Sequence, residues 1–192
     1  MARYQIRLTG RSPLLTHNPR LADPEDEITR EIATITSKRK KTDDDRRAIG
    51  RLEWFGGLYL EGGLPVLPTA NVRKCFIEAG KTKKLGKQLG RAVSFMDFTT
   101  PIVYEGPKDT DKLYGRADFK LRATVVNNGK GRIVRVRPRF PSWEIVTDVE
   151  LLEDLLNPGD LIEIATLAGL IEGLGDNRVN GYGRFTAEVT PL

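Results

Sequence analysis

The sequence predicts an α+β fold in a single domain spanning residues 1–192, and three observations support this prediction. First, apolar side chains occupy every second position in short segments near both ends and in the middle of the chain, a pattern typical of half-buried strands. Second, other segments place apolar side chains three and four positions apart, as amphipathic helices do. Third, 39% of the 192 residues are hydrophobic, which suffices for one buried core, and no repeat or low-complexity linker divides the chain.

The N-terminal half is expected to begin with a strand and to continue as helices. Alternating apolar residues predict the strand over 4–10. A helix is predicted over 24–37, where Asp23 can act as the N-terminal cap. A second helix is predicted over 42–54, because its first residues are acidic and suit the positive end of a helix dipole.

Two more helices and a short strand are predicted in the middle of the chain. Thr69 is a plausible cap for a helix that turns Val72 and Phe76 inward. A lysine-rich break separates this helix from a shorter one over 85–93. The apolar run over 102–104 indicates a strand.

The C-terminal half is predicted to hold a hairpin, a further strand, a helix and a last strand. Asn-Asn-Gly-Lys-Gly at 127–131 is a strong turn signal between strands over 119–126 and 132–137. The remaining predicted elements, in order, are a strand over 143–151, a helix that begins at Asn157-Pro158, and a strand over 185–189. This order suits a ferredoxin-like core, an antiparallel sheet with helical insertions, and adds a glycine-rich loop near the C-terminus.

Composition excludes several classes of site. Lys and Arg number 31 against 26 Asp and Glu, so the net charge is +5, a modest excess whose distribution matters more than its size. The single cysteine, Cys75, allows no intramolecular disulfide or cysteine-rich zinc site and is expected in the core, and the single histidine, His17, allows no multi-histidine site. We therefore expect no metal and no cofactor. Without a signal-peptide region or a membrane-spanning apolar run, the protein is expected in the cytoplasm, away from membranes.

A row of arginines in the second hairpin strand is the first candidate for ligand binding. Arg135, Arg137 and Arg139 alternate with apolar residues, and residues two apart share a face of a strand. Like charges in such a row repel each other unless an anion offsets the repulsion, and the guanidinium fork matches phosphate oxygens. A solvated strand face paired with acidic neighbours is the alternative interpretation.

A second basic set is predicted in the middle of the chain. Lys84, Lys87 and Arg91 are three and four positions apart, so we expect them on one face of a helix. Each cation that neutralises a phosphate releases a counterion, so binding through these groups should weaken steeply with salt.

The most specific feature is the glycine-rich segment 173–185. Its glycines permit tight turns and close backbone approach, so that exposed N–H groups can contact phosphate oxygens. The order of elements argues against a Rossmann dinucleotide site, which needs glycines after a strand and before a helix, whereas here they follow a helix and precede a strand. The predicted contact residues of this segment are Gly175, Arg178, Gly181, Tyr182, Gly183 and Arg184, with Tyr182 able to stack on a base or sugar.

The segment 173–185 resembles the glycine-rich loop of the RAMP superfamily, the RNA-binding subunits of CRISPR effector complexes. The segment 64–74 is similar to the proline-led turn and basic helix start of their backbone-forming subunits, although Thr69-Ala70 replaces the usual Gly-Ser, and the segment 12–15 fits the end of their first strand. These matches cover about a quarter of the chain. The resemblance implies a modified RRM-like topology and single-stranded nucleic-acid binding, and a stand-alone virus-encoded relative is equally compatible with it.

The same resemblance suggests two catalytic candidates. Processing endoribonucleases of the superfamily use a histidine near the N-terminus as general base toward a ribose 2′-OH, and His17 lies in the loop after the first strand. Some backbone subunits cleave RNA with a loop aspartate and a metal ion, which makes Asp23 the second candidate. A histidine that bonds the backbone and an aspartate that caps a helix are the simpler alternatives.

The leading hypothesis is a non-catalytic protein that grips single-stranded RNA or DNA by its phosphates, with weak sequence preference and assembly of copies along the strand. In this hypothesis, the hairpin arginines and the glycine-rich segment form one groove. The alternatives are a metal-independent endoribonuclease that uses His17 and a protein-interaction module. Phosphate and stacking contacts serve RNA and DNA alike, so the sequence leaves that choice open.

Overall fold

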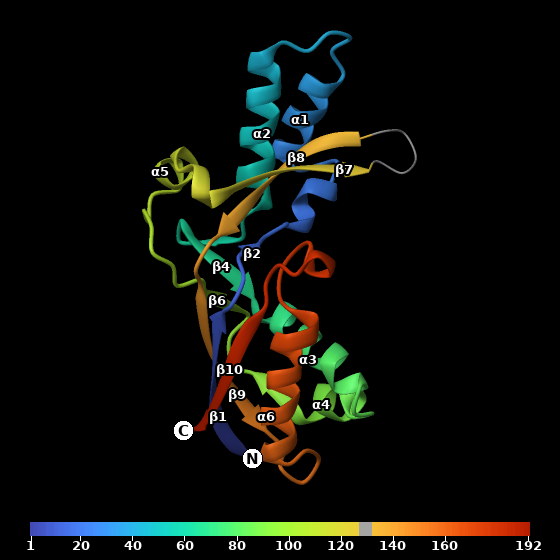
Figure 1. Cartoon of the computed structure of the whole chain (residues 1–192), viewed down its shortest axis with the longest axis vertical. Helices are drawn as coiled ribbons and strands as arrows, with labels where there is room; N and C mark the ends of the chain where they lie inside the picture. Colours follow the sequence, from blue (N-terminus) through green and yellow to red (C-terminus); the bar gives the residue numbers. More distant parts are fainter. Residues whose placement is uncertain (127–131) are drawn as a thin grey trace. The chain divides into compact units, whose positions relative to one another are not determined.

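The computed structural model describes residues 1–126 and 132–192, and the predicted hairpin turn at 127–131 lies outside the described residues. The chain divides into two compact units (Figure 1). The core unit comprises Met1–Leu15, Pro65–Glu105 and Pro141–Leu192, and the insert unit comprises Thr16–Leu64 and Gly106–Phe140. Whether they behave as the single domain that the sequence predicts stays a prediction.

The core unit contains a four-stranded sheet in the order β10-β1-β9-β5, and each pair of neighbours is antiparallel. Its strands are β1 (Ala2–Gly10), β5 (Val93–Phe95), β9 (Glu144–Leu151) and β10 (Phe185–Pro191). Tyr4, Ile6 and Leu8 of β1 are buried, as the alternation predicts, and Ile6 lies opposite Val189 on β10 and Thr147 on β9. The strands predicted at both ends of the chain are therefore confirmed.

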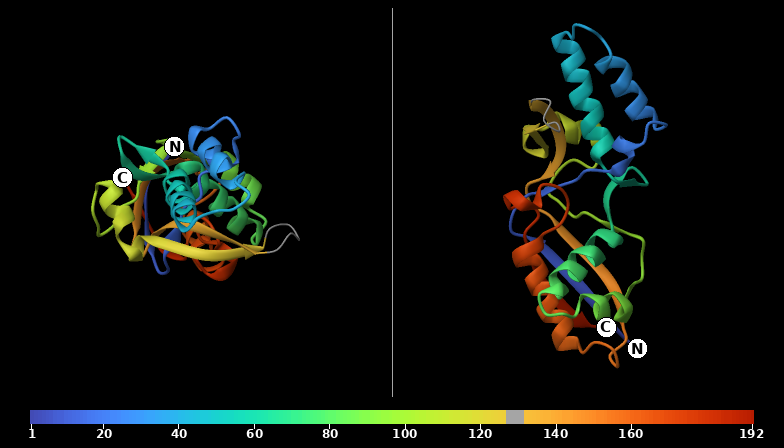
Figure 2. Two further views of the ribbon diagram at one scale, coloured as in Figure 1. Left: turned by 90° about the horizontal axis from the view of Figure 1, so that it is seen from above. Right: turned by 90° about the vertical axis from the view of Figure 1, so that its right-hand side faces the viewer.

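Helices cover one face of this sheet, as the views in Figures 1 and 2 show. They are α3 (Thr69–Lys81), α4 (Gly86–Ala92) and α6 (Pro158–Leu167), and a π-helical turn over Ala168–Glu172 extends α6. Asn157 caps α6 by accepting a hydrogen bond from the amide of Asp160, as expected before Pro158. Phe76 of α3, Ile164 of α6 and Phe185 of β10 are fully buried in this unit, and Cys75 is a core thiol. Burial raises the pKa of Cys75 to about 12.

Three expectations for the core unit were wrong. Thr69 is the first residue of α3 rather than its cap, because its hydroxyl donates to the carbonyl of Asp97 at 2.6 Å. Val93 does not end a helix but begins β5, where it pairs with Leu151. The strand expected over 102–104 is reduced to a β-bridge between Val103 and Glu144, and the strand itself lies earlier, as β6 (Thr99–Pro101), which pairs with β4 (Leu64–Pro68).

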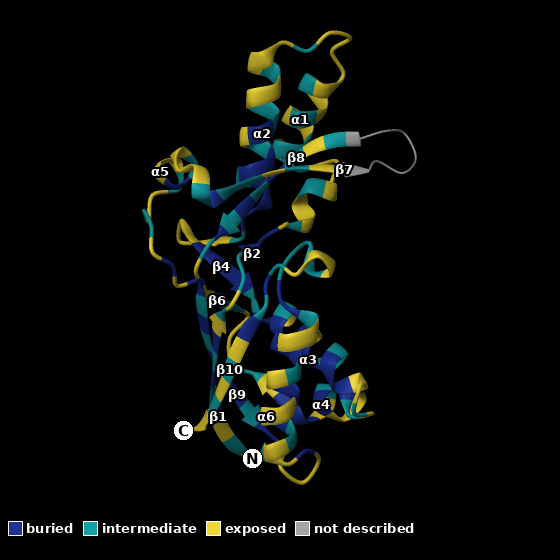
Figure 3. Ribbon diagram, viewed as in Figure 1, coloured by how far each residue is buried: buried dark blue, intermediate teal, exposed yellow. Residues whose placement is uncertain are grey.

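The insert unit combines a helical hairpin with a β-hairpin. The helices are α1 (Glu27–Thr36) and α2 (Asp43–Gly57), the strands are β7 (Lys120–Val126) and β8 (Arg132–Phe140), and α5 (Thr110–Gly115) precedes β7. Gly50 lets α2 approach β8, because a Cβ at this position would already lie 3.0 Å from Cγ2 of Val136. Trp54 is fully buried and donates from its indole nitrogen to the carbonyl of Phe119 at 2.8 Å. Figure 3 shows this buried side of α2 in dark blue.

The starts of the two insert helices are set by their capping residues. Thr42 and Asp45 form a reciprocal capping box at α2, which confirms that α2 begins there. The cap of α1, however, is Asp26 and not Asp23, since the carboxylate of Asp26 accepts from the amides of Ile28 and Thr29. α1 therefore begins three residues later than predicted.

The other short elements are β2 (Leu14–Leu15), β3 (Leu60–Glu61) and 3₁₀ turns over Pro19–Ala22, Ala117–Phe119 and Arg178–Asn180. None of the helices that the structure describes combines the length and the hydropathy of a membrane-spanning segment.

Candidate nucleic-acid interface

The hairpin arginines lie on one face of β8, as their spacing predicts. Arg135, Arg137 and Arg139 are half-buried, whereas Val136, Pro138 and Phe140 between them are buried. Val136 and Phe140 face the interior of the insert unit, so the alternation places the Cβ atoms of the three arginines on the other face of the strand.

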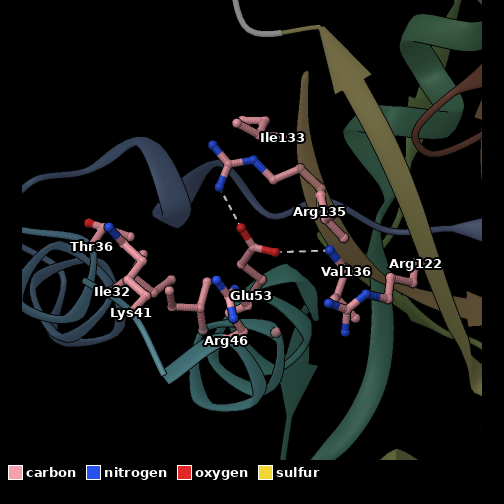
Figure 4. Close-up of a pocket in the computed structure, with 12 residues that line it drawn as sticks. Ile32, Thr36, Lys41, Arg46, Glu53, Arg122, Ile133, Arg135 and Val136 are labelled. Atoms are coloured by element: carbon pink, nitrogen blue, oxygen red, sulfur yellow. Dashed lines mark hydrogen bonds and ion pairs between the residues drawn. The ribbon is translucent and has the colours of Figure 1, made fainter. Parts of the chain in front are cut away.

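A buried carboxylate that sequence reasoning missed holds the first of these arginines. Glu53 on α2 is only 3% exposed, forms an ion pair with Arg135 and accepts the backbone amide of Val136 at 2.9 Å. Figure 4 shows the carboxylate of Glu53 between these two donors. The side chain of Arg135 stays 38% exposed, so Glu53 orients the guanidinium and leaves part of it open to solvent. Arg135 is thus paired with an acidic neighbour, as the alternative interpretation of the arginine row expects.

The other two arginines differ in their contacts. Arg139 donates to the carbonyl of Asp118 at 2.8 Å, which ties β8 to the turn before β7. Arg137 lines a groove of about 250 Å³, together with Arg135 and His17. His17 is exposed, and its own carbonyl accepts a hydrogen bond from the hydroxyl of Tyr59. The structure therefore places the histidine candidate beside two of the predicted arginines.

A larger groove of about 580 Å³ opens between the helical hairpin and the β-hairpin of the insert unit (Figure 4). Apolar side chains of α1, α2 and β8 contribute to its lining, among them Ile32, Ile49 and Val134. Among the described residues, its charged lining consists of four cations and one acid, namely Lys41, Arg46, Arg122, Arg135 and Glu53. Such a surplus of cations attracts anions into the groove.

Arg122 is the most available of these cations. It is exposed on β7 opposite Val136 and makes no hydrogen bond or ion pair within the described parts of the chain. Arg46, by contrast, pairs with Asp43 one helical turn away, at 2.6 Å. Sequence reasoning missed Arg122, although Lys120 lies two positions earlier in the same strand, because only the pairing of β7 with β8 brings Arg122 into the groove.

The glycine-rich segment 173–185 lies in the core unit and packs closely against other parts of its backbone, and we call it the clasp. Gly173, Gly175, Gly181 and Gly183 all have positive φ angles, which favour glycine. A Cβ at Gly183 would lie 1.9 Å from the carbonyl oxygen of Leu174, and one at Gly175 would lie 2.1 Å from that of Leu15. The close approach that these two glycines permit is therefore to the chain itself.

Several amides of this clasp are engaged internally, contrary to the expectation of exposed donors. The amide of Gly183 donates to Pro13, that of Asp176 donates to Leu15, and that of Arg184 donates to the hydroxyl of Ser12. Gly181 differs, because it is exposed and its missing side chain faces open space. Tyr182 is half-buried rather than surrounded by solvent.

The two arginines of the clasp line a cavity of about 470 Å³ with the acids Glu172 and Asp176. Nη1 of Arg178 lies 3.9 Å from Oε2 of Glu172. These residues belong to the core unit and the hairpin arginines to the insert unit, so the expectation of one shared groove stays a prediction.

The lysine-rich set does not share one helix face. Lys87 and Arg91 are exposed on α4, but Lys84 precedes the helix with a left-handed backbone (φ 61°). The expected i, i+3 geometry fails because the helix begins only at Gly86. Asp23, the second catalytic candidate, accepts the amide of Glu25 in the turn before α1.

Comparisons with known proteins show which folds this architecture is similar to. No protein-family profile and no curated protein sequence matches the chain. Among solved structures, a chain of a Type III-B Cmr-beta assembly bound to cognate target RNA aligns with a TM-score of 0.57 at 17% identity, over 99% of this chain and 61% of that one. That protein is a RAMP-type CRISPR subunit. The chain has a RAMP-like fold.

The RAMP-like fold agrees with the resemblance seen in the sequence. The chain spans about three fifths of the length of the Cmr-beta chain. A Type IV-B CRISPR complex (TM-score 0.48, 12% identity, 98% of this chain and 90% of that chain) and Cmr4 (TM-score 0.44, 9% identity, 98% of each) also match.

Proposed function

We propose that the protein binds single-stranded nucleic acid through its phosphates, with the cation-lined grooves of the insert unit as the main contact surface. The observation that carries this proposal is the larger groove, where four cations face one buried carboxylate. Glu53 keeps Arg135 extended at the groove, and Arg122 is available within the described chain. Guanidinium groups bind phosphate oxygens in a planar, bidentate geometry.

The fold supports the same proposal. The core unit follows the order strand, helix, strand, strand, helix, strand through β1, α3, β5, β9, α6 and β10, with the sheet order β10-β1-β9-β5. This order is that of a ferredoxin-like core, which RNA-binding RRM domains use. The chain of similar fold comes from a Cmr-beta assembly that is bound to cognate target RNA. For this reason, we propose RNA rather than DNA as the ligand. We also propose that copies of the protein are arranged along the strand.

A gel-shift titration with matched variants tests the proposal. Arg135→Gln with Arg137→Gln removes two positive charges from the grooves while an amide donor remains beside Glu53. We expect the affinity for single-stranded RNA to fall at least roughly tenfold at low salt, since each lost charge-assisted contact weakens binding. Arg30→Gln with Lys112→Gln makes the same change of net charge at exposed positions outside both grooves. Equal losses in the two double variants would contradict a specific site.

A second candidate function follows from the smaller groove. His17 lines it with Arg135 and Arg137, and a histidine base beside arginines that stabilise a phosphorane is suited to cleavage of RNA at a 2′-OH. We propose a metal-independent endoribonuclease as this alternative. Labelled RNA incubated with the protein and a chelator should then be cut by the wild type and stay intact with His17→Ala. RNA that stays intact with the wild type removes this alternative and leaves the binding proposal in place.

A protein-interaction module is the third possibility. It predicts no affinity for RNA or DNA at physiological salt, so the same titration decides it.

A further inference from the structure

A small cavity in the core unit lies where the clasp meets the end of β1. Its volume is about 270 Å³, and it is lined by Arg11, Ser12, Gly169, Leu170 and Arg184. Two of these residues are cationic and none is acidic. The neighbouring cavity of about 470 Å³ shares Arg184 but includes the carboxylates of Glu172 and Asp176. An anion is therefore expected to prefer the smaller cavity.

Backbone hydrogen bonds fix the two arginines of this cavity beside each other. The amides of Arg11 and Ser12 both donate to the carbonyl of Arg184, at 2.7 and 3.2 Å. The hydroxyl of Ser12 accepts the amide of Arg184 at 2.9 Å and donates to the carbonyl of Gly181 at 2.7 Å. These bonds hold the backbones of Arg11 and Arg184 together. Little conformational entropy of the backbone is therefore lost when one ligand contacts both guanidinium groups.

One guanidinium nitrogen of Arg184 lacks an acceptor within the described part of the chain. Nη1 of Arg184 is shielded from solvent and forms no hydrogen bond to any residue that the structure describes. Nη2 reaches only the carbonyl of Arg178, at a long 3.4 Å. A buried charged donor without a partner is costly, and buried polar groups in proteins nearly always bind something. Arg11 is exposed and makes no ion pair within the described part of the chain.

We propose that this cavity binds a phosphate group, with Arg11 and Arg184 as its two cationic contacts. The inference rests on the proposed function for its source of phosphate, which is the nucleic acid. A phosphate offers several acceptor oxygens to two guanidinium forks and supplies the acceptor that Nη1 of Arg184 lacks. The phosphate is either a phosphodiester within the strand or a phosphomonoester at its 5′ end.

The test uses fluorescence anisotropy with the full chain and one RNA sequence, labelled at its 3′ end and made with a 5′-hydroxyl or a 5′-phosphate. Arg11→Gln and Arg184→Lys are the cavity variants. Arg184→Lys keeps the charge but not the fork. Arg3→Gln, in β1 and paired with Glu150, is the control for loss of one charge. We expect Arg11→Gln to weaken binding roughly tenfold and Arg3→Gln less than about twofold.

The two sources of phosphate are separated by the oligonucleotides. Equal losses for both RNAs identify a phosphodiester, whereas a loss confined to the 5′-phosphorylated RNA identifies the terminal group. Unchanged affinity in Arg11→Gln overturns the proposed phosphate site in this cavity. In that case, the proposed function still holds if the Arg135 and Arg137 double variant loses binding. No binding by the wild type overturns both. Because Arg11 is exposed, its variant keeps the test valid even if Arg184→Lys fails to fold.

Discussion

At the scale of single residues, the glycines of the clasp differ in what occupies the space where a side chain would be. Gly175 and Gly183 look alike in the sequence as parts of a phosphate-binding loop, yet both are needed because another carbonyl of the chain lies where a Cβ would be. Gly181 has a similar positive φ of 83° but faces open space. The surroundings of each glycine, rather than its conformation, therefore separate a structural role from a possible contact role.

This difference predicts unequal effects of alanine in the clasp. Gly181→Ala should cost about 1–2 kcal/mol, the strain of a left-handed alanine. Gly183→Ala should cost clearly more, over about 3 kcal/mol, because its Cβ would lie 1.9 Å from the carbonyl oxygen of Leu174 and displace the clasp. Urea denaturation of both variants measures the difference. Similar losses of unfolding free energy would show that the clasp adjusts freely.

At the scale of elements, α2 is the helix that positions the candidate site. Its capping box fixes where it begins, Gly50 lets it approach β8, and Glu53 reaches the edge of that strand. The ion pair of Lys38 with Asp45, at 2.6 Å, also joins the end of α1 to the start of α2. The hydrogen bond from Lys38 and that from the amide of Thr42 lower the pKa of Asp45 to about 2.

The lowered pKa predicts a pH dependence of the start of α2. A carboxyl with a folded-state pKa near 2, below its unfolded value of about 3.9, stabilises the fold above the unfolded pKa and loses this contribution as pH falls through the folded one. Between about pH 4 and pH 2, the wild type should therefore lose more stability than Asp45→Asn. Thermal melts of the two proteins across this range measure it. Parallel curves would contradict the assignment.

Thr42→Ala tests the same helix start at neutral pH. The loss of a threonine cap typically costs about 1 kcal/mol, because the amide of Asp45 loses its acceptor. Thr34→Ala is the matched control, since its hydroxyl bonds only the carbonyl one turn back within α1. Denaturant midpoints of the two variants should differ accordingly, and a negligible effect of Thr42→Ala would show that tertiary packing alone holds α2.

At the scale of the whole molecule, the proposed binding mode is electrostatic and spread over several cations. The net charge of +5 is small, so affinity depends on where the cations gather. The grooves of the insert unit and the cavity of the core unit are two such places, in two separate units of the chain.

Salt dependence measures how many phosphates the protein neutralises. The logarithm of the affinity for single-stranded RNA should fall linearly with the logarithm of the salt concentration, by about 0.7 per phosphate contact. The Arg135→Gln, Arg137→Gln variant should reduce this slope by about 1.4, because two contacts are lost. An unchanged slope would mean that these arginines do not neutralise phosphates, even if the affinity falls.

Local patterns in the sequence determined much of this protein's architecture. Alternation gave the correct faces of β1, β8 and β9, the Asn157-Pro158 pair gave the start of α6, and the clasp was recognisable as a distinctive motif. These features depend on neighbours along the chain, and for that reason they can be read from it. The start of α1 does not follow from such a pattern, since Asp23 and Asp26 are chemically equivalent caps.

Only the tertiary structure decided which charges are satisfied. Arg135 meets Glu53 across 82 positions of sequence, Arg122 enters a groove through strand pairing, and Arg11 meets Arg184 at the two ends of the chain. The free energy of a charged side chain depends on what surrounds it in space, and the sequence does not state those distances. The same physics makes an unpaired guanidinium nitrogen in the core unit informative, because burial without a partner is costly.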